Sequence, residues 1–116
     1  MTAHVLVTGA NGYVGQALAR RLAAQLAAGA LQSLTLLDQH AATDDSLRES
    51  LPAAARDRLH LVVGDLRDPA IRAQALAQRP GRVFHLAGIT SRQAEDAFAL
   101  GLGVNVEAAM ALFEAL

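Results

Sequence analysis

The sequence predicts an α/β fold in which helices cover both faces of a doubly wound parallel sheet. Short, continuously apolar runs at residues 5–7, 34–37, 59–63 and 83–86 are typical of parallel strands that are buried on both faces. Helical patterns alternate with these runs, which favours right-handed crossovers and the strand order 3-2-1-4. The 116 residues, 53% of them hydrophobic, suit one globular domain whose sheet is cut short after about four strands.

The first helix follows a glycine-rich run and is expected to end at Gly29, which stands where a C-terminal cap belongs. Four apolar residues recur at intervals of four and are predicted to form one buried stripe on this helix: Val14, Leu18, Leu22 and Leu26. Between Gln39 and Arg58 the sequence is polar and broken by Pro52. We therefore expect a loop there, with one or two short helical turns in place of a full helix.

Two further helices are expected in the second half of the chain. Asp68 followed by Pro69 predicts an N-cap and a first helical position, and the run Arg79-Pro80-Gly81 is expected to end that helix before the fourth strand. From about residue 93 to residue 116 the pattern is mainly helical, with two glycines at which the helix can bend.

Three evenly spaced glycines join the first strand to the first helix: Gly9, Gly12 and Gly15. Gly9 permits the tight turn, Gly12 lets the backbone come close to a pyrophosphate, and Gly15 lets the helix pack on the sheet. The helix N-terminus then faces the anion. Asp38, at the end of the second apolar run, can accept bonds from both ribose hydroxyls, so the pattern predicts a dinucleotide site of the Rossmann type.

Other residues of this loop have less specific roles. Thr8 and Asn11 either orient the loop backbone or bond a phosphate oxygen, whereas Tyr13 is expected to pack or to cover the diphosphate. Val14 belongs to the same binding run.

Composition argues against several other functions. The formal net charge of -1, without a basic cluster, gives no electrostatic footprint for nucleic acid. The absence of cysteine excludes disulfides and thiolate metal sites, and His4, His40 and His60 show no metal-ligand pattern, so no metal is expected. We expect no membrane segment and no signal peptide, which favours the cytoplasm.

Four segments together resemble the extended short-chain dehydrogenases/reductases, also called the NAD-dependent epimerase/dehydratase family. They are the run from Thr8 to Gly15, then Asp38, then residues 64–68 (GDLRD), then residues 85–88 (HLAG). The resemblance covers the whole chain and implies NAD as the cofactor. Within the family, residues 94–106 resemble the D-erythronate dehydrogenases and close relatives that act on sugar acids.

The resemblance also assigns cofactor contacts. It implies that Asp65 and Leu66 meet the adenine, although Asp65 could instead only cap a turn. It places Ala87 and Gly88 beneath the dinucleotide and Asn105 near it, while the residues after Val106 depart from the family's pattern. His85, inside an apolar strand, is either a structural residue or a catalyst, and we favour the structural role.

The family's proton transfer uses a Tyr-x-x-x-Lys pair. This chain has Tyr13 as its one tyrosine and no lysine, so no catalytic residue is assigned. Residues 1–116 are expected to be the N-terminal part of a dinucleotide-binding domain, with the substrate part absent.

The predicted function is the NAD-binding portion of an oxidoreductase or epimerase that acts by hydride transfer on a sugar acid or nucleotide sugar. Asp38 favours NAD, because a carboxylate repels the 2′-phosphate of NADP. The alternative is a non-catalytic member that senses or regulates, and a pure scaffold is disfavoured. A homodimer is plausible, but the same apolar residues could form an intramolecular core: Phe98, Leu102, Val106 and Leu112.

Overall fold

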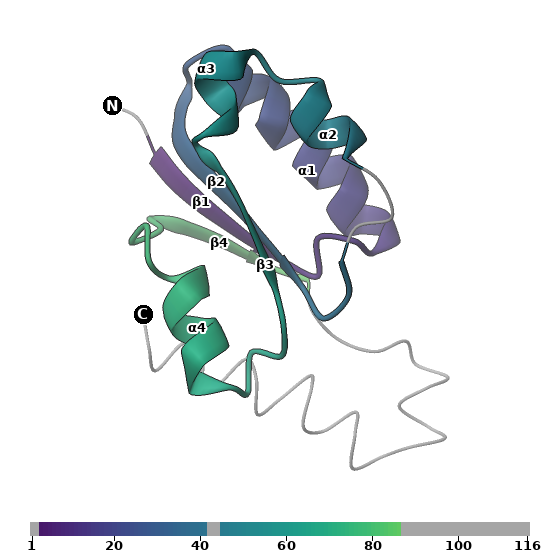
Figure 1. Cartoon of the computed structure of the whole chain (residues 1–116), viewed down its shortest axis with the longest axis vertical. Helices are drawn as coiled ribbons and strands as arrows, with labels where there is room; N and C mark the ends of the chain where they lie inside the picture. Colours follow the sequence, from purple (N-terminus) through teal and green to yellow (C-terminus); the bar gives the residue numbers. More distant parts are fainter. Residues whose placement is uncertain (1–2, 42–44, 87–116) are drawn as a thin grey trace.

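The structure, a computed structural model, describes residues 3–41 and 45–86. Within them a parallel sheet has the order β3-β2-β1-β4 (Figure 1). Its strands are β1 (Ala3–Thr8), β2 (Leu31–Asp38), β3 (Leu59–Val63) and β4 (Arg82–His85). This confirms the predicted fold class and strand order.

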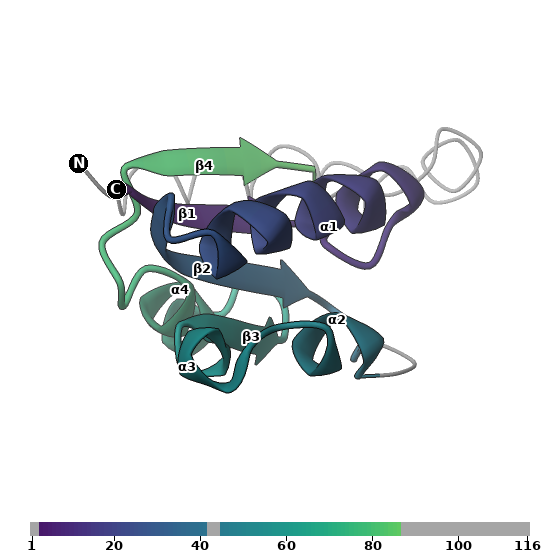
Figure 2. The ribbon, with the colours of Figure 1, turned by 90° about the horizontal axis from the view of Figure 1, so that it is seen from above.

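Helices lie on both faces of the sheet (Figure 2). The first crossover is α1 (Tyr13–Ala27), and the second consists of two single turns, α2 (Ser46–Glu49) and α3 (Ala53–Arg56). These three lie on one face, whereas α4 (Pro69–Ala75) lies on the other (Figures 1 and 2). The short turns expected between Gln39 and Arg58 are thereby confirmed.

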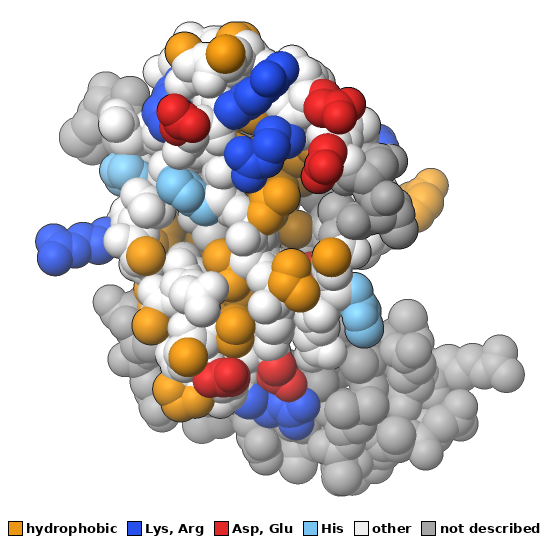
Figure 3. All heavy atoms as spheres, viewed as in Figure 1, with side chains coloured by type: hydrophobic (Ala, Val, Ile, Leu, Met, Phe, Trp, Pro, Cys, Tyr) orange, Lys and Arg blue, Asp and Glu red, His pale blue; other side chains and the backbone are white. Residues whose placement is uncertain are grey.

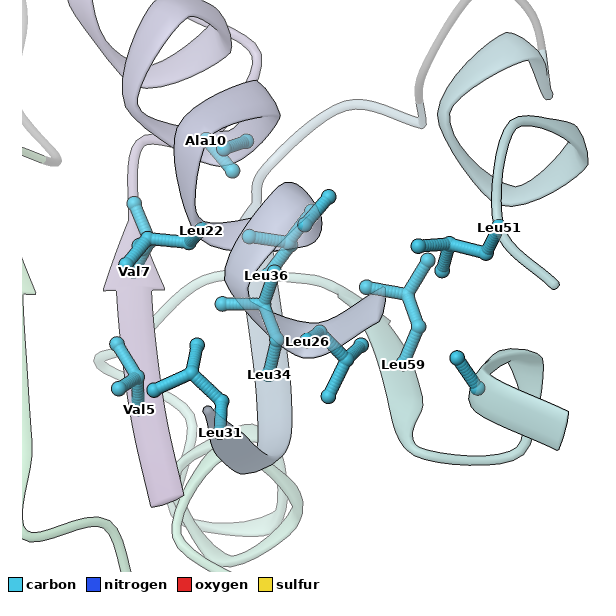
Figure 4. Close-up of a cluster of buried hydrophobic side chains, with 13 residues drawn as sticks. Val5, Val7, Ala10, Leu22, Leu26, Leu31, Leu34, Leu36, Leu51 and Leu59 are labelled. Carbon is cyan, nitrogen blue, oxygen red and sulfur yellow. The ribbon is translucent and has the colours of Figure 1, made fainter. Parts of the chain in front are cut away.

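Two buried clusters hold the helices to the sheet. On the α1 face, Val5, Val7 and Leu34 pack against Leu22 and Leu26 of α1 (Figure 4). On the α4 face, the second cluster joins strand residues to the loop after β3 and to α4: Leu6, Leu37 and Val62 of the strands, Leu66 of the loop and Ala75 of α4. Successive strand side chains point to opposite faces, so a continuous apolar run supplies both clusters.

The predicted stripe on α1 is partly wrong. The buried residues of this helix are Gly15, Ala19, Leu22, Ala23 and Leu26, and Leu18 is only partly buried. Val14 is 64% exposed. Gly15 packs directly on the loop after β1, and this contact sets which side of the first turn faces the sheet. Val14 lies about 100° around the helix from Gly15 and so points to solvent.

Several predicted boundaries also shift. β2 begins at Leu31 rather than at residue 34, because Leu31 and Ser33 already pair with β1. Helix α4 ends at Ala75, before the run that begins at Arg79. The two cap predictions are confirmed: Gly29 has φ +81° just after α1, and the Asp68 carboxylate accepts a bond from the Ala70 N–H (2.9 Å). In residues 3–41 and 45–86, no helix is long and apolar enough to cross a membrane.

Candidate dinucleotide site

Three loops meet where the carboxyl ends of the strands lie side by side. The glycine loop follows β1, residues 39–41 follow β2, and Gly64 follows β3. Backbone bonds hold these segments together: the Ala10 N–H donates to the Leu37 carbonyl (3.1 Å), and the Gly64 N–H donates to the Asp38 carbonyl (3.0 Å). In open α/β sheets this edge is where ligands bind.

Gly9 and Gly12 of the loop and Gly15 of α1 are glycine for different reasons. Gly9 has φ +71°, a backbone conformation that residues with a side chain rarely adopt. A Cβ at Gly15 would lie 2.1 Å from the Gly9 carbonyl oxygen, so the helix could not pack so closely on the loop. Gly12 has φ −70°, and a Cβ there would lie 3.3 Å from the same oxygen. The fold therefore demands glycine at 9 and 15 but only weakly at 12, and the close approach of a pyrophosphate to Gly12 stays a prediction.

The first turn of α1 presents backbone donors at this edge. The Gln16 N–H donates to the Gly12 carbonyl (2.9 Å), which is the first bond of the helix. The N–H groups of Tyr13, Val14 and Gly15 precede it and have no acceptor within the helix. Such groups, together with the helix dipole, suit a phosphate. The Tyr13 side chain is 97% exposed, so its predicted covering role stays a prediction.

Asp38 lies at the centre of the site and is held by two backbone donors. Its Oδ2 accepts from the Asn11 N–H (3.0 Å), and its Oδ1 accepts from the His40 N–H (3.1 Å). The carboxylate is half-buried and bridges the glycine loop to the segment after β2. Each oxygen keeps a further lone pair, so the carboxylate can still accept ribose hydroxyls.

Asn11 and Gln16 complete this network, and the sequence reasoning missed most of it. The Asn11 side-chain amide donates to the His40 carbonyl, and the Gln16 side chain donates to the Asn11 carbonyl (2.8 Å). Of the two roles expected for Asn11, the structure shows the one that orients the loop. Gln16 gave no sequence signal, because its acceptor is a backbone atom.

A cleft of about 750 Å³ opens beside the network. Its lining includes Asn11, Gly12 and Asp38 of the network, together with Leu61 and Val63 of β3. Because α2 and α3 are single turns, these two apolar side chains remain about half exposed. Figure 3 shows charged side chains of both signs gathered over α2 and α3, with apolar side chains between them.

The two residues predicted to contact the adenine, Asp65 and Leu66, lie in the loop after β3. Both oxygens of the Asp65 carboxylate accept from the Arg67 guanidinium (2.6–3.1 Å), and Oδ1 also accepts from the Arg67 N–H (2.8 Å). The Arg67 side-chain bonds hold the pKa of Asp65 below its ordinary value. Asp65 therefore does cap a turn, and its adenine contact stays a prediction.

The side chain of Leu66 is buried, so only its backbone is left for the predicted contact with the edge of the adenine ring. Its carbonyl accepts from the Arg72 guanidinium (2.8 Å), so α4 holds this loop in place.

His85 lies on β4 beside the end of β1. Its Nδ1 is 2.7 Å from the Thr8 hydroxyl, and the two residues are register partners across the sheet. Burial lowers the pKa of this imidazole. The contact between strands supports the structural role that we favoured.

Three predicted cofactor residues lie outside the described residues: Ala87, Gly88 and Asn105. The helix expected after residue 93, with the apolar residues considered for a dimer, lies outside them as well.

Comparison with known proteins identifies relatives of this chain. A model of the NAD-dependent epimerase/dehydratase family matches residues 5–116. D-erythronate dehydrogenase from Cupriavidus necator is 40% identical in an alignment 119 positions long, which covers 96% of this chain and 33% of that protein. The chain thus spans about a third of the length of this curated relative.

Solved structures share the fold at similar coverage. A nucleoside-diphosphate-sugar epimerase from Agrobacterium tumefaciens is 29% identical with a TM-score of 0.77, over 98% of this chain and 32% of that one. An epimerase from Methanothermobacter thermautotrophicus is 27% identical with a TM-score of 0.74, over 97% of this chain and 31% of that one.

Proposed function

The chain belongs to the NAD-dependent epimerase/dehydratase family, and from this premise we propose that it is the NAD-binding portion of an oxidoreductase or epimerase. The proposed reaction is hydride transfer on a sugar acid or nucleotide sugar. The sugar acid is suggested by the D-erythronate dehydrogenase relative, and the nucleotide sugar by the epimerase from Agrobacterium tumefaciens.

One observation carries the cofactor proposal: the glycine loop and Asp38 are joined directly by the bond from the Asn11 N–H to the Asp38 carboxylate. The open N–H groups of the first α1 turn therefore lie near a fixed carboxylate. A dinucleotide needs both, since its diphosphate requires donors and its ribose requires acceptors. Gly12, which the fold itself hardly requires, leaves room for the diphosphate to approach.

The residues of this chain bind and orient the cofactor in this proposal. NAD, when bound, supplies the redox chemistry as acceptor or donor of the hydride. The 116 residues contain no lysine, and so no Tyr-x-x-x-Lys pair, and we propose no catalytic residue among them. The non-catalytic sensor considered from the sequence would use the same site, but 40% identity to a dehydrogenase favours the enzyme. The cytoplasmic location and the homodimer stay predictions.

Isothermal titration of the 116-residue chain with NAD tests the binding function. We expect saturable binding with one NAD per chain. A matched titration with NMN, which carries the nicotinamide half but no adenosine, should give much weaker binding because it cannot reach Asp38. A folded chain that binds no NAD would contradict the proposal.

A further inference from the structure

The Asp38 carboxylate is held at both of its oxygens by donors from two different loops. One donor is the Asn11 N–H of the glycine loop, and the other is the His40 N–H of the segment after β2. A carboxylate with one such bond could rotate about its side-chain torsions. With two, its orientation depends on how the two loops are held relative to each other.

The Asn11 side chain closes this arrangement into a ring. It donates to the carbonyl of His40, the same residue whose N–H holds Asp38. Three bonds therefore connect Asn11, Asp38 and His40 in a circle. The Gln16 side chain in turn holds the Asn11 carbonyl from the second turn of α1 (2.8 Å), so the ring is anchored to the helix.

We propose that Asn11 is a specificity-determining positioning residue, whose side-chain amide keeps Asp38 fixed and so makes the site discriminate against a ribose 2′-phosphate. This inference rests on the proposed NAD-binding function. A fixed carboxylate presents its negative charge where the 2′-phosphate would lie, and it cannot turn away to relieve the repulsion. The same fixed oxygens suit two neutral hydroxyls, so the discrimination acts on the phosphate alone.

Loss of the Asn11 side-chain amide should therefore change the preference for NAD over NADP more than it changes the affinity for NAD. In Asn11→Ala both backbone donors to Asp38 remain, but the His40 segment loses the side-chain bond that ties its carbonyl to the glycine loop. Asp38 can then shift together with that segment. We expect the ratio of the NADP and NAD dissociation constants to fall about three- to tenfold, as for the loss of one hydrogen bond.

A matched pair on α1 tests the anchor without altering the loop. Gln16→Ala removes the bond to the Asn11 carbonyl and should lower the same ratio by a smaller factor. Gln25→Ala makes the identical change at another exposed position of α1 and should leave the ratio unchanged. Alanine favours helix, so both variants are expected to fold even if Asn11→Ala does not.

Titrations of the full 116-residue chain with NAD and with NADP give the ratio for each protein, and thermal unfolding reports stability separately. The inference is supported if Asn11→Ala and Gln16→Ala lower the ratio and Gln25→Ala does not. It is overturned if the wild type prefers NAD and both Asn11→Ala and Gln16→Ala leave the ratio unchanged, or if Asn11→Ala weakens both cofactors equally. A wild type that binds neither cofactor would instead refute the proposed function.

Discussion

Gly12, the N-cap of α1, and Gly15, in its first turn, lie three residues apart, yet the structure requires glycine strictly at only one of them. A Cβ at Gly15 would approach backbone atoms of Gly9 and Ala10 within 3.0 Å, whereas at Gly12 the one contact is at 3.3 Å. Gly15→Ala should therefore destabilise the fold by about 3 kcal/mol through overpacking. Gly12→Ala should change stability by less than about 1 kcal/mol.

The two variants should separate folding from binding. We expect Gly12→Ala to weaken NAD binding because its Cβ enters the space of the diphosphate, while urea unfolding remains close to that of the wild type. Urea titrations and NAD titrations of both variants check this. Equal loss of stability in both would show that glycine at 12 is needed by the fold itself.

Asp38 carries the predicted choice of cofactor. Asp38→Ala removes the carboxylate that accepts the ribose hydroxyls and repels the 2′-phosphate. We expect NAD affinity to fall about tenfold or more, since bonds to a charged group are strong, while NADP affinity falls less or rises. Calorimetric titration with both cofactors measures this. An unchanged preference would refute the assignment of Asp38 to the ribose.

The lowered pKa of His85 predicts how the free energy of unfolding depends on pH. Burial lowers its pKa in the folded chain below the ordinary value of 6.5. As pH falls below 6.5, the unfolded chain takes up a proton that the folded chain resists, so the free energy of unfolding should fall. The lowered pKa of Asp65 acts only in stronger acid, below its ordinary 3.8. His85→Asn should flatten the profile between neutral pH and that acid range, as measured by denaturant unfolding.

At the level of single residues, the sequence predicted those whose role depends on their own chemistry. Gly9, Gly15 and Asp38 carry a turn, a close contact and a charge, and each is recognisable from its type and spacing. The Asn11 and Gln16 amides act on backbone carbonyls, and any residue can supply a carbonyl. Their partners depend on how two loops approach in space, which spacing alone does not reveal.

Among the elements, α4 owes its start to a single cap. Asp68 accepts from the Ala70 N–H, and Pro69 follows at the first helical position. With seven residues, α4 has few internal bonds to offset the loss of the cap. Asp68→Ala should cost about 1 kcal/mol, and Asp68→Asn should restore most of it. Thermal unfolding of the two variants checks this, and equal stability of both would argue against the cap.

The limits of element prediction are visible in β2. The sequence predicts a strand over the apolar run from Leu34 to Leu37. The first three residues of β2, Leu31 to Ser33, were missed because Gln32 and Ser33 are polar. Ser33 is nevertheless 3% exposed, since its hydroxyl bonds with the His4 ring (2.6 Å) on the neighbouring strand. A polar residue can enter a sheet once a partner from another strand satisfies it, and that partner cannot be seen in local sequence.

For the molecule as a whole, the strand order follows from alternation of strands and helices, and it was predicted correctly. The same order leaves β3 and β4 at the two ends of the described sheet. Both ends carry exposed apolar side chains: Leu61 and Val63 on β3, and Phe84 on β4. An apolar strand with an open edge tends to pair with another chain.

Within residues 3–41 and 45–86, β4 pairs with β1 alone, and on this basis we expect the chain to self-associate through the other edge of β4. Phe84 is 36% exposed, and a lysine there would place a charge beside the open edge, the device by which natural edge strands avoid pairing. Phe84→Lys should shift the chain toward monomer in sedimentation velocity runs over a range of concentrations. Ala54→Lys adds the same charge on an exposed position of α3 and should not. If wild type and both variants sediment as monomers at every concentration, the open edge of β4 does not drive association.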